Sequence, residues 1–321
     1  MTGAGGTSPH PYLEYGGLTS VPGPFHCSEA RITMTALLAD PDRLGSLCAT
    51  VLVEPDGTSR YTPVGEFVML SFGSMVVRST CPDRSGFFDA SYSDMGAAVE
   101  HHVALWVPTV AHCGDGDVES IDQFALFLPA MWVDNPVSLL GGREIYGIAK
   151  QWGVPTIGDD HSCSLDVIGG DFGPGAMADE HRLLDISPSP DIHPGKAVRE
   201  LADEVGRIVG DGLRKLLHGQ VDVPDRALLA EVERAVVDRQ LHQVAIRQFR
   251  TPAGDGTSGS TPELVGITTR FSSLDVKLLD HGFDVVVHPL DSHPLLTSLG
   301  IASQTTVVGL EVAADFVLSA D

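Results

Sequence analysis

One lysine in this chain has the surroundings of a catalytic nucleophile. The 321 residues include four lysines, and Lys150 is the only one among the first 195. Its neighbours Ile148, Ala149 and Trp152 are apolar, which favours a buried side chain. Burial disfavours the ammonium form and lowers the pKa of a lysine, and the neutral amine can attack a ketone to form a Schiff base. We therefore predict that Lys150 is catalytic. The alternative is a lysine whose stem packs beneath Trp152 while its ammonium reaches water.

A glutamate is placed to act as the acid–base partner of such a lysine. Glu100 lies just before an apolar segment, Val103–Val110, that we predict to be a strand. A carboxyl group buried at the start of this strand would have a raised pKa and could transfer protons. The alternative is a solvated carboxylate at the end of the strand.

Other motifs for catalysis or cofactor binding are weak. The glycine-rich segment 169–175 lacks a complete GxGxxG pattern and contains a proline, so it favours a turn over a phosphate-binding loop. His101, His102 and His112 lack the spacing of known zinc motifs. His101 and His102 are adjacent and would point to opposite faces of a strand. We therefore expect no metal and no cofactor.

The composition excludes several classes of partner. The chain carries 43 acidic and 20 basic residues, for a net charge of -23. Such a surface repels nucleic acids and anionic membranes, and no apolar segment is long enough to span a bilayer. The five cysteines are widely spaced and form no CxxC motif, which indicates free thiols in a reducing compartment. The N-terminus lacks the features of a signal peptide, so we expect a cytoplasmic protein.

The elements that must position these residues are mostly strands. Short β-branched and apolar segments alternate with turns rich in Gly, Asp and Pro, which predicts an antiparallel sheet or barrel. The expected strands are Arg31–Leu38, Thr50–Val53, Phe67–Phe72, Val103–Val110, Phe124–Leu128, Thr268–Phe271, Asp284–His288, Thr305–Val312 and Phe316–Leu318. Residues 138–150 favour a short helix that turns at Gly147.

The segment 196–249 has a different pattern from the rest of the chain. Its apolar residues, including Leu201, Leu213, Leu229, Leu241 and Ala245, recur at helical spacing. We predict two amphipathic helices inserted into a single domain that spans residues 1–321. Residues 1–24 are rich in Gly, Pro and Ser and are expected to form a tail or an arm.

Three segments resemble the acetoacetate decarboxylase superfamily. Met131-Trp132-Val133-Asp134-Asn135-Pro136 is followed by Gly142-Arg143-Glu144 and then by Ala149-Lys150. The family shows a Met-aromatic-aliphatic-Asp-Asn segment, then Gly-Arg-Glu, then Pro-Lys-Lys. The resemblance implies an α+β fold with a mainly antiparallel β-sheet curved around a central closed β-barrel, and it implies a homo-oligomer.

The resemblance also implies roles for particular residues. Lys150 would form the Schiff base, Glu100 would be the acid–base residue, and Arg31 would hold the substrate carboxylate. Met131 would line an apolar pocket, and Arg143 would pair with Glu144 to orient the lysine segment. The substrate-binding positions implied are Phe25, Met131, Arg143 and Gln151.

Two departures from the family pattern affect the choice of reaction. Ala149 replaces the proline, and Gln151 replaces the second lysine, so burial or an arginine must do more to lower the pKa of Lys150. Gln151 either contributes to the site or points away from it. These changes bear on decarboxylation more than on Schiff-base formation.

We predict a Schiff-base-forming carbon–carbon lyase that acts on a small keto acid, with decarboxylation of a β-keto acid as the first choice. The alternative enzyme is an aldolase-dehydratase or cyclase of secondary metabolism that uses the same lysine and an aldehyde co-substrate. The alternative of another class is a non-enzymatic β-barrel that binds a small acid, with Lys150 as its ion-pair partner.

Overall fold

The computed structural model describes residues 20–53, 61–83, 90–113, 120–170, 174–193, 238–250 and 259–320. The expected N-terminal arm lies outside the described residues except for its last few positions. Most of the expected helical insertion, residues 194–237, also lies outside them.

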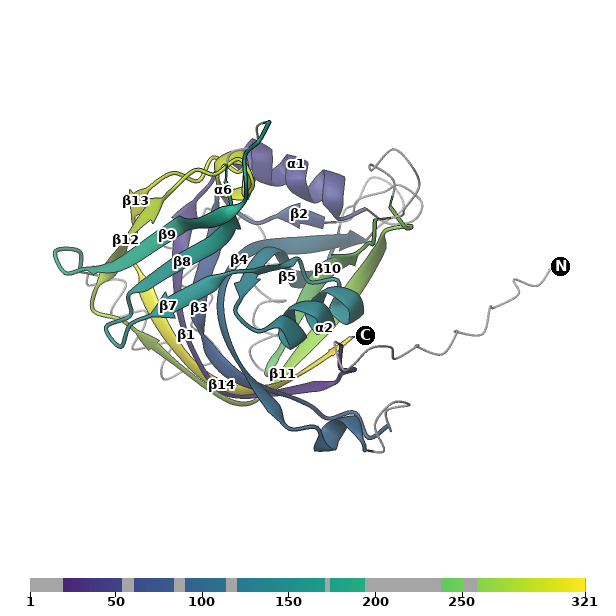
Figure 1. Cartoon of the computed structure of the whole chain (residues 1–321). Coiled ribbons are helices and arrows are strands. Elements are labelled where there is room, and N and C mark those ends of the chain that lie inside the picture. The colour runs from purple at the N-terminus through teal and green to yellow at the C-terminus, as the bar shows by residue number, and fades with distance from the viewer. Residues whose placement is uncertain are drawn as a thin grey trace.

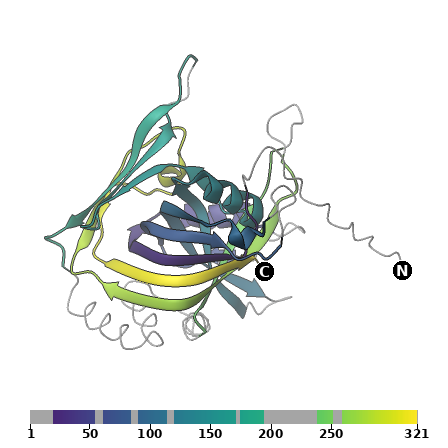
Figure 2. The ribbon, with the colours of Figure 1, turned by 60° about the horizontal axis from the view of Figure 1, so that its bottom comes forward.

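A closed β-barrel of seven strands forms the centre of the molecule (Figures 1 and 2). Neighbouring strands are antiparallel except β10 and β5, which are parallel. The barrel closes because β4 pairs with both β3 and β5. In order around the barrel, the strands are β4 (Ala97–Cys113), β3 (Phe67–Ser79), β1 (Phe25–Leu38), β14 (Gly309–Ala320), β11 (Glu263–Leu278), β10 (Gln240–Arg247) and β5 (Ser120–Val133). The expected α+β fold built on a closed barrel is confirmed.

Two short strands extend this sheet, and a second sheet packs against it. β2 (Tyr61–Pro63) pairs with β4, and β6 (Lys150–Trp152) pairs with β5. The second sheet is antiparallel and lies beside the barrel (Figure 1). Its strands in order are β13 (Gln304–Thr305), β12 (Gly282–Val287), β9 (Asp179–Ser189), β8 (Cys163–Gly169) and β7 (Val154–Ile157).

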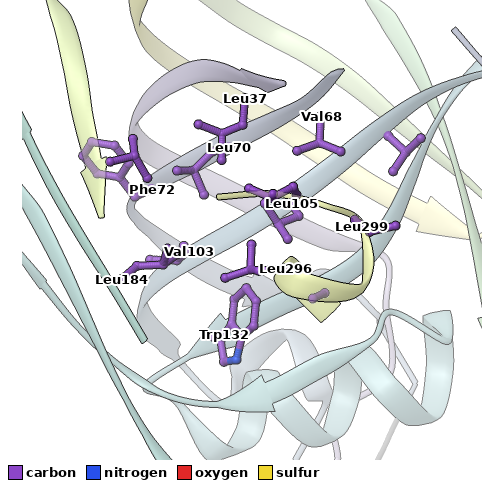
Figure 3. Packing of buried hydrophobic residues seen from close by; sticks show 14 of the residues in the cluster. Leu37, Val68, Leu70, Phe72, Val103, Leu105, Trp132, Leu184, Leu296 and Leu299 are labelled. Carbon is purple, nitrogen blue, oxygen red and sulfur yellow. The ribbon is translucent and has the colours of Figure 1, made fainter. Parts of the chain in front are cut away.

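The larger hydrophobic core fills the space between the outer face of the barrel and this second sheet. Phe72, Leu105 and Trp132 from the barrel strands are almost fully buried there, together with Leu184 of β9 (Figure 3). Phe72 also meets Phe283 of β12 edge to face, with ring centroids 6.0 Å apart. The second sheet therefore shields one side of the barrel from water and holds its strands in place.

Helix α1 (Pro41–Val51) corrects the expectation of a strand over Thr50–Val53. Asp40 caps its first turn by accepting a hydrogen bond from the Arg43 amide. Leu44, Cys48 and Leu52 are spaced four residues apart and are fully buried, so burial along one helical face outweighs the β-propensity of the last few residues. Two shorter helical segments among the described residues are the 3-10 turn Tyr92–Asp94 and α6 (Leu295–Ser298).

Strand β10 corrects the expectation that the helical segment extends to residue 249. Leu241 and Ala245 were expected in a helix but lie in this strand. Val244 packs into the core between the sheets, and Ala245 packs into the core inside the barrel. Because both faces of β10 are buried, its apolar residues do not alternate with polar ones and mimic helical spacing.

The remaining expected strands lie within longer observed strands or differ at their ends. The predicted strand Thr305–Val312 is split, since β13 ends at Thr305 and β14 begins at Gly309. The predicted strand Asp284–His288 corresponds to β12, which ends at Val287. Cys27, Cys48, Cys81 and Cys163 are free and buried, in agreement with the expected thiols. In the described parts of the chain, no helix has the length and apolarity needed to cross a membrane.

The core between the two sheets should carry much of the stability. Leu105→Ala removes a fully buried side chain and should lower the free energy of unfolding by about 2–5 kcal/mol. Val286→Ala, on the outer face of the second sheet, should change it by only ~0.5 kcal/mol because that side chain is 43% exposed. Urea unfolding measures both values. Equal effects of the two substitutions would contradict this assignment of the core.

Candidate active site

The interior of the barrel contains a second hydrophobic core with a polar group at its edge. Glu100 of β4 pairs with Met75 of β3. Further along β4, Ala104 pairs with Met131 of β5. Side chains two apart on a strand share a face, so Glu100, His102 and Ala104 all point inward. The apolar residues of this interior cluster are Ala104, Leu128, Met131, Val133, Tyr146, Ile148, Ala245, Val265 and Ile267.

Helix α2 (Pro136–Tyr146) leads the chain to Lys150. Asn135 caps the helix, since its side-chain oxygen accepts hydrogen bonds from the amides of Val137 and Ser138 at 3.0 Å each. Gly147 ends the helix with a left-handed backbone (φ 67°), which glycine adopts without strain. The helix therefore starts two residues before the expected position 138 and stops before Lys150, which begins strand β6.

The backbone of Lys150 is held on both sides. It pairs with Met131 in the parallel register of β5 and β6. Arg143 donates a hydrogen bond from its guanidinium to the carbonyl oxygen of Lys150 at 2.8 Å. Arg143 is itself exposed. The structure therefore gives Arg143 a positioning contact with the lysine segment, and its expected role in substrate binding stays a prediction.

Lys150, Glu100 and Ser138 form a compact hydrogen-bonded group inside the barrel. Lys150 Nζ lies 2.6 Å from Glu100 Oε2 and 2.5 Å from Ser138 Oγ. The Ser138 hydroxyl in turn donates to Glu100 Oε2. Glu100 is 0% exposed and Lys150 is 6% exposed. The alternatives of a lysine head in water and a solvated glutamate are therefore both wrong.

The ionisation of Glu100 differs from the expectation. Burial raises its pKa, but the Lys150 ammonium, the nearby His102 and the hydrogen bonds from Lys150 and Ser138 outweigh burial and hold the pKa below its ordinary value. The expected raised pKa is therefore wrong, because the sequence did not reveal how close the cation lies. Glu100 is a carboxylate at neutral pH and can accept a proton.

Two further titratable groups near Glu100 are neutral. Burial lowers the pKa of His102 to about 4, so its imidazole is uncharged at neutral pH. Burial, with a smaller contribution from the Glu100 charge, raises the pKa of Cys27 to about 12, so its thiol stays protonated. His102 and Cys27 therefore add no charge beside the Glu100 carboxylate at neutral pH. Among the described residues, no three His, Cys, Asp or Glu side chains are grouped as metal ligands would be.

Gly142 makes room for the stem of Lys150. A Cβ atom at Gly142 would lie 2.6 Å from Lys150 Cδ and 2.8 Å from Cε, which is closer than carbon atoms pack. The lysine side chain therefore crosses helix α2 at a point where only hydrogen fits.

Two of the expected substrate-binding residues lie on or beside the interior core. Met131 is buried there and is the register partner of Lys150. Phe25 packs against the same core, with its ring 5.7 Å from that of Tyr146. Burial raises the pKa of the Tyr146 phenol, whose hydroxyl donates to the Leu318 carbonyl at 3.2 Å.

The other two candidates, Arg31 and Gln151, do not join the group. If residues of β1 alternated regularly from Cys27, Arg31 would point into the barrel. A bulge between Cys27 and Ala30, where Glu29 has φ 54°, adds one residue to the strand. The residues beyond the bulge therefore point to the opposite face. Arg31 pairs with Ser74 and is exposed. Gln151 follows Lys150 on a strand and pairs with Trp132 of the outer core, so it faces away from Lys150.

Sequence reasoning missed Ser138, His102, Cys27 and Gly142. The position of His102 could have been predicted from the sequence, because residues two apart on a strand share a face and His102 therefore lies on the same face as Glu100. The Asn135-Pro136 pair is typical of a helix start and would have placed Ser138 in the first helical turn. Cys27 and Gly142 depend on contacts between distant segments and gave no local signal.

Comparisons with known proteins identify the fold. No family model and no curated protein sequence matches the chain. The solved structures of similar fold include the enduracididine biosynthesis enzyme MppR bound to the condensation product of pyruvate and imidazole 4-carboxaldehyde, with 14% identity, a TM-score of 0.50 and coverage of 94% of this chain and 89% of that one. MppR bound to pyruvate aligns with 13% identity, a TM-score of 0.50 and coverage of 94% and 90%.

An acetoacetate decarboxylase-like enzyme from Sphingomonas wittichii RW1 also aligns, with 13% identity, a TM-score of 0.50 and coverage of 93% of this chain and 92% of that one. At these identities the alignments establish the fold. This chain has the acetoacetate decarboxylase-like fold, as the sequence resemblance implied.

The buried ion pair should control how stability depends on pH. In the wild-type protein, the lowered pKa of Glu100 contributes stability that is present above the carboxyl pKa of an unfolded chain, about 4.3, and is lost as pH falls through the lower folded value. Lys150→Met leaves Glu100 buried without its cation, which should raise its pKa above the unfolded value. Stability of the variant should then decrease as pH rises from about 4 to 7 relative to wild type.

Urea unfolding at several pH values measures this difference. Lys277→Met is the matched control, since Lys277 pairs with Asp275 at the surface and its side chain is 63% exposed. Its stability profile should run parallel to that of the wild type. If the stability of Lys150→Met also follows the same pH dependence as the wild type, the charge of Lys150 does not lower the pKa of Glu100 as described.

Proposed function

We propose that this protein is a lyase that forms a Schiff base between Lys150 and the ketone of a small keto acid. The observation that carries the proposal is the buried contact of Lys150 Nζ with Glu100 and Ser138 inside a closed barrel. The acetoacetate decarboxylase-like fold supports it. This function requires a nucleophile, a proton acceptor beside it and limited access of water, and the three residues with their apolar neighbours meet these requirements.

Glu100 activates the lysine. Attack requires an amine with a free electron pair, and the carboxylate 2.6 Å from Nζ is the group placed to accept the proton that the lysine gives up when the ketone arrives. Ser138 keeps the two groups aligned, because its hydroxyl contacts both. The amine attacks the ketone carbon, and loss of water gives an iminium that withdraws electrons from the neighbouring bonds. The lysine itself supplies this electron sink, so the proposed reaction needs no cofactor.

Decarboxylation of a β-keto acid is the first candidate reaction. The iminium accepts the electron pair of the breaking carbon–carbon bond as CO2 departs. The apolar side chains around Lys150, among them Met131, Val133 and Ile148, favour this step because a carboxylate in apolar surroundings is poorly solvated and its charge disperses in the transition state.

Condensation and dehydration form the second candidate. It is favoured by the alignment with MppR, which was captured with pyruvate and with a condensation product of pyruvate and an aldehyde. Here the iminium loses a proton to Glu100, the resulting enamine attacks an aldehyde co-substrate, and elimination of water follows. Release of CO2 from a panel of β-keto acids, and consumption of an aldehyde together with pyruvate, distinguish the two reactions.

Covalent trapping tests the role of Lys150. Borohydride added with pyruvate or with a β-keto acid substrate should reduce the iminium to a stable adduct on Lys150, located by peptide mass spectrometry. Lys150→Met should form no adduct and should lose turnover. Lys277→Met should keep both, since Lys277 is exposed at the surface. Wild-type protein that binds a keto acid without forming an adduct would support the non-enzymatic binding barrel instead.

Gly142 should be required for the reactivity of Lys150. Gly142→Ala places a methyl group against the lysine stem and displaces Nζ from Glu100. A displacement of about 1 Å can reduce catalysis by roughly 100-fold, so kcat/KM should fall by about that factor. Gly45→Ala is the control because it adds a methyl to helix α1 where no atom lies within 4 Å. The control should keep its activity, and equal activity of both variants would contradict the role of Gly142.

A further inference from the structure

The second oxygen of Glu100 faces a neighbouring polar atom that is also buried. Oε2 is occupied by Lys150 and Ser138, whereas Oε1 lies 3.6 Å from His102 Nδ1. Both atoms are buried, and neither has a hydrogen-bond partner among the described residues. Glu100 is 0% exposed and His102 is 2% exposed, so protein surrounds the pair.

Two buried polar atoms in this arrangement indicate a binding site for a small polar group. Buried polar atoms in proteins almost always have hydrogen-bond partners, and 3.6 Å is too long for a direct bond between these two. One oxygen atom placed beside both can bond to each. Because Glu100 is a carboxylate and His102 is neutral, the site favours a hydroxyl or water that donates to Oε1 over an anion.

The position of this site relative to Lys150 indicates which oxygen it binds. Oε1 belongs to the carboxylate whose other oxygen lies 2.6 Å from Nζ. When Nζ bonds to a ketone carbon, the ketone oxygen is two bonds from Nζ. This oxygen can therefore lie beside Oε1 while the nitrogen remains beside Oε2.

We propose that Glu100 Oε1 and His102 Nδ1 together bind the oxygen that leaves the substrate ketone as water during Schiff-base formation. The proposal rests on the proposed function of Lys150 and adds His102 as a catalytic residue. His102, with its proton on Nδ1, donates a hydrogen bond to the departing oxygen. Glu100 carries protons from the nitrogen to that oxygen.

The proton transfers balance without any further reactant. Glu100 takes one proton from the ammonium, Nζ bonds to the ketone carbon, and the electron pair of the C=O π bond moves to oxygen, which receives that proton from Glu100. Glu100 then takes a second proton from nitrogen and passes it to the hydroxyl. The C–O bond breaks, water leaves, and the C=N iminium keeps the third proton. Glu100 ends as a carboxylate and His102 stays neutral.

Exchange of the ketone oxygen with solvent measures this step alone. Pyruvate and acetone are incubated with the protein in water enriched in ¹⁸O, and mass spectrometry follows label entering the ketone, because reversible iminium formation removes and restores that oxygen. Wild-type protein should catalyse the exchange. His102→Leu should slow it by about ten-fold or more, since an acid–base hydrogen bond is lost while apolar packing is kept.

Two variants separate hydrogen bonding from packing. His102→Asn can place a neutral hydrogen-bonding group near the position of Nδ1, so it should exchange faster than His102→Leu. His101→Leu is the matched control, since His101 is adjacent, its side chain is 42% exposed, and it pairs with Asp134 on the other face. It should exchange at the wild-type rate. If His102→Leu does not fold, His102→Gln replaces it, because its longer side chain carries the amide beyond Nδ1, and slow exchange is expected again.

The outcomes distinguish this proposal from the one on which it rests. Exchange by His102→Leu within about two-fold of wild type, or faster than by His102→Asn, overturns the role of His102 while a borohydride adduct on Lys150 keeps the Schiff-base function. Wild-type protein that forms no adduct and catalyses no exchange overturns both. Slow exchange in His102→Leu, with partial recovery in His102→Asn and a full rate in His101→Leu, supports the site.

Discussion

The ion pair of Lys150 and Glu100 inside the barrel is the interaction on which the rest of the site depends. Two opposite charges removed from water are costly unless they contact each other and other polar groups. The 2.6 Å contact and the hydroxyl of Ser138 supply that compensation. Removing either charge would leave the other uncompensated in an apolar interior. The same contact places a proton acceptor 2.6 Å from Nζ, which is the distance that proton transfer requires.

The fold brings this group together from separate segments. Glu100 lies on β4, Ser138 on α2 and Lys150 on β6, and 50 residues of chain separate Glu100 from Lys150. Pairing of β4 with β5 and of β5 with β6 brings the three segments side by side. Arg143 fixes the lysine backbone from the helix, and the second sheet buries the outer face of the same strands. A rigid barrel can hold such a site to the tolerance that catalysis needs, which isolated loops achieve less well.

The local pattern of the chain predicted much of this architecture and part of the site. Alternating segments predicted an antiparallel sheet or barrel, the family resemblance implied the closed barrel, and the apolar neighbours of Lys150 predicted its burial. The errors have physical causes. The apolar run in β10 reflects burial on both faces rather than a helix, and the strand expected at Thr50–Val53 is helical because Leu44, Cys48 and Leu52 line one face. The single-domain, cytoplasmic and homo-oligomeric expectations stay predictions.

The sequence by itself determined which residues could do chemistry, because a lone lysine among apolar neighbours and a glutamate before an apolar strand are local features. It also determined that the chain is mostly strands, since strand periodicity is local, whereas closure of the barrel depends on the pairing of β4 with β5. Only the tertiary structure decided which groups meet. A single bulge at Glu29 turns Arg31 outward, strand alternation turns Gln151 away, and the cation beside Glu100 lowers a pKa that burial alone would raise. Electrostatic energies and side-chain facing depend on distances between segments remote in sequence, and these distances exist only once the chain has folded.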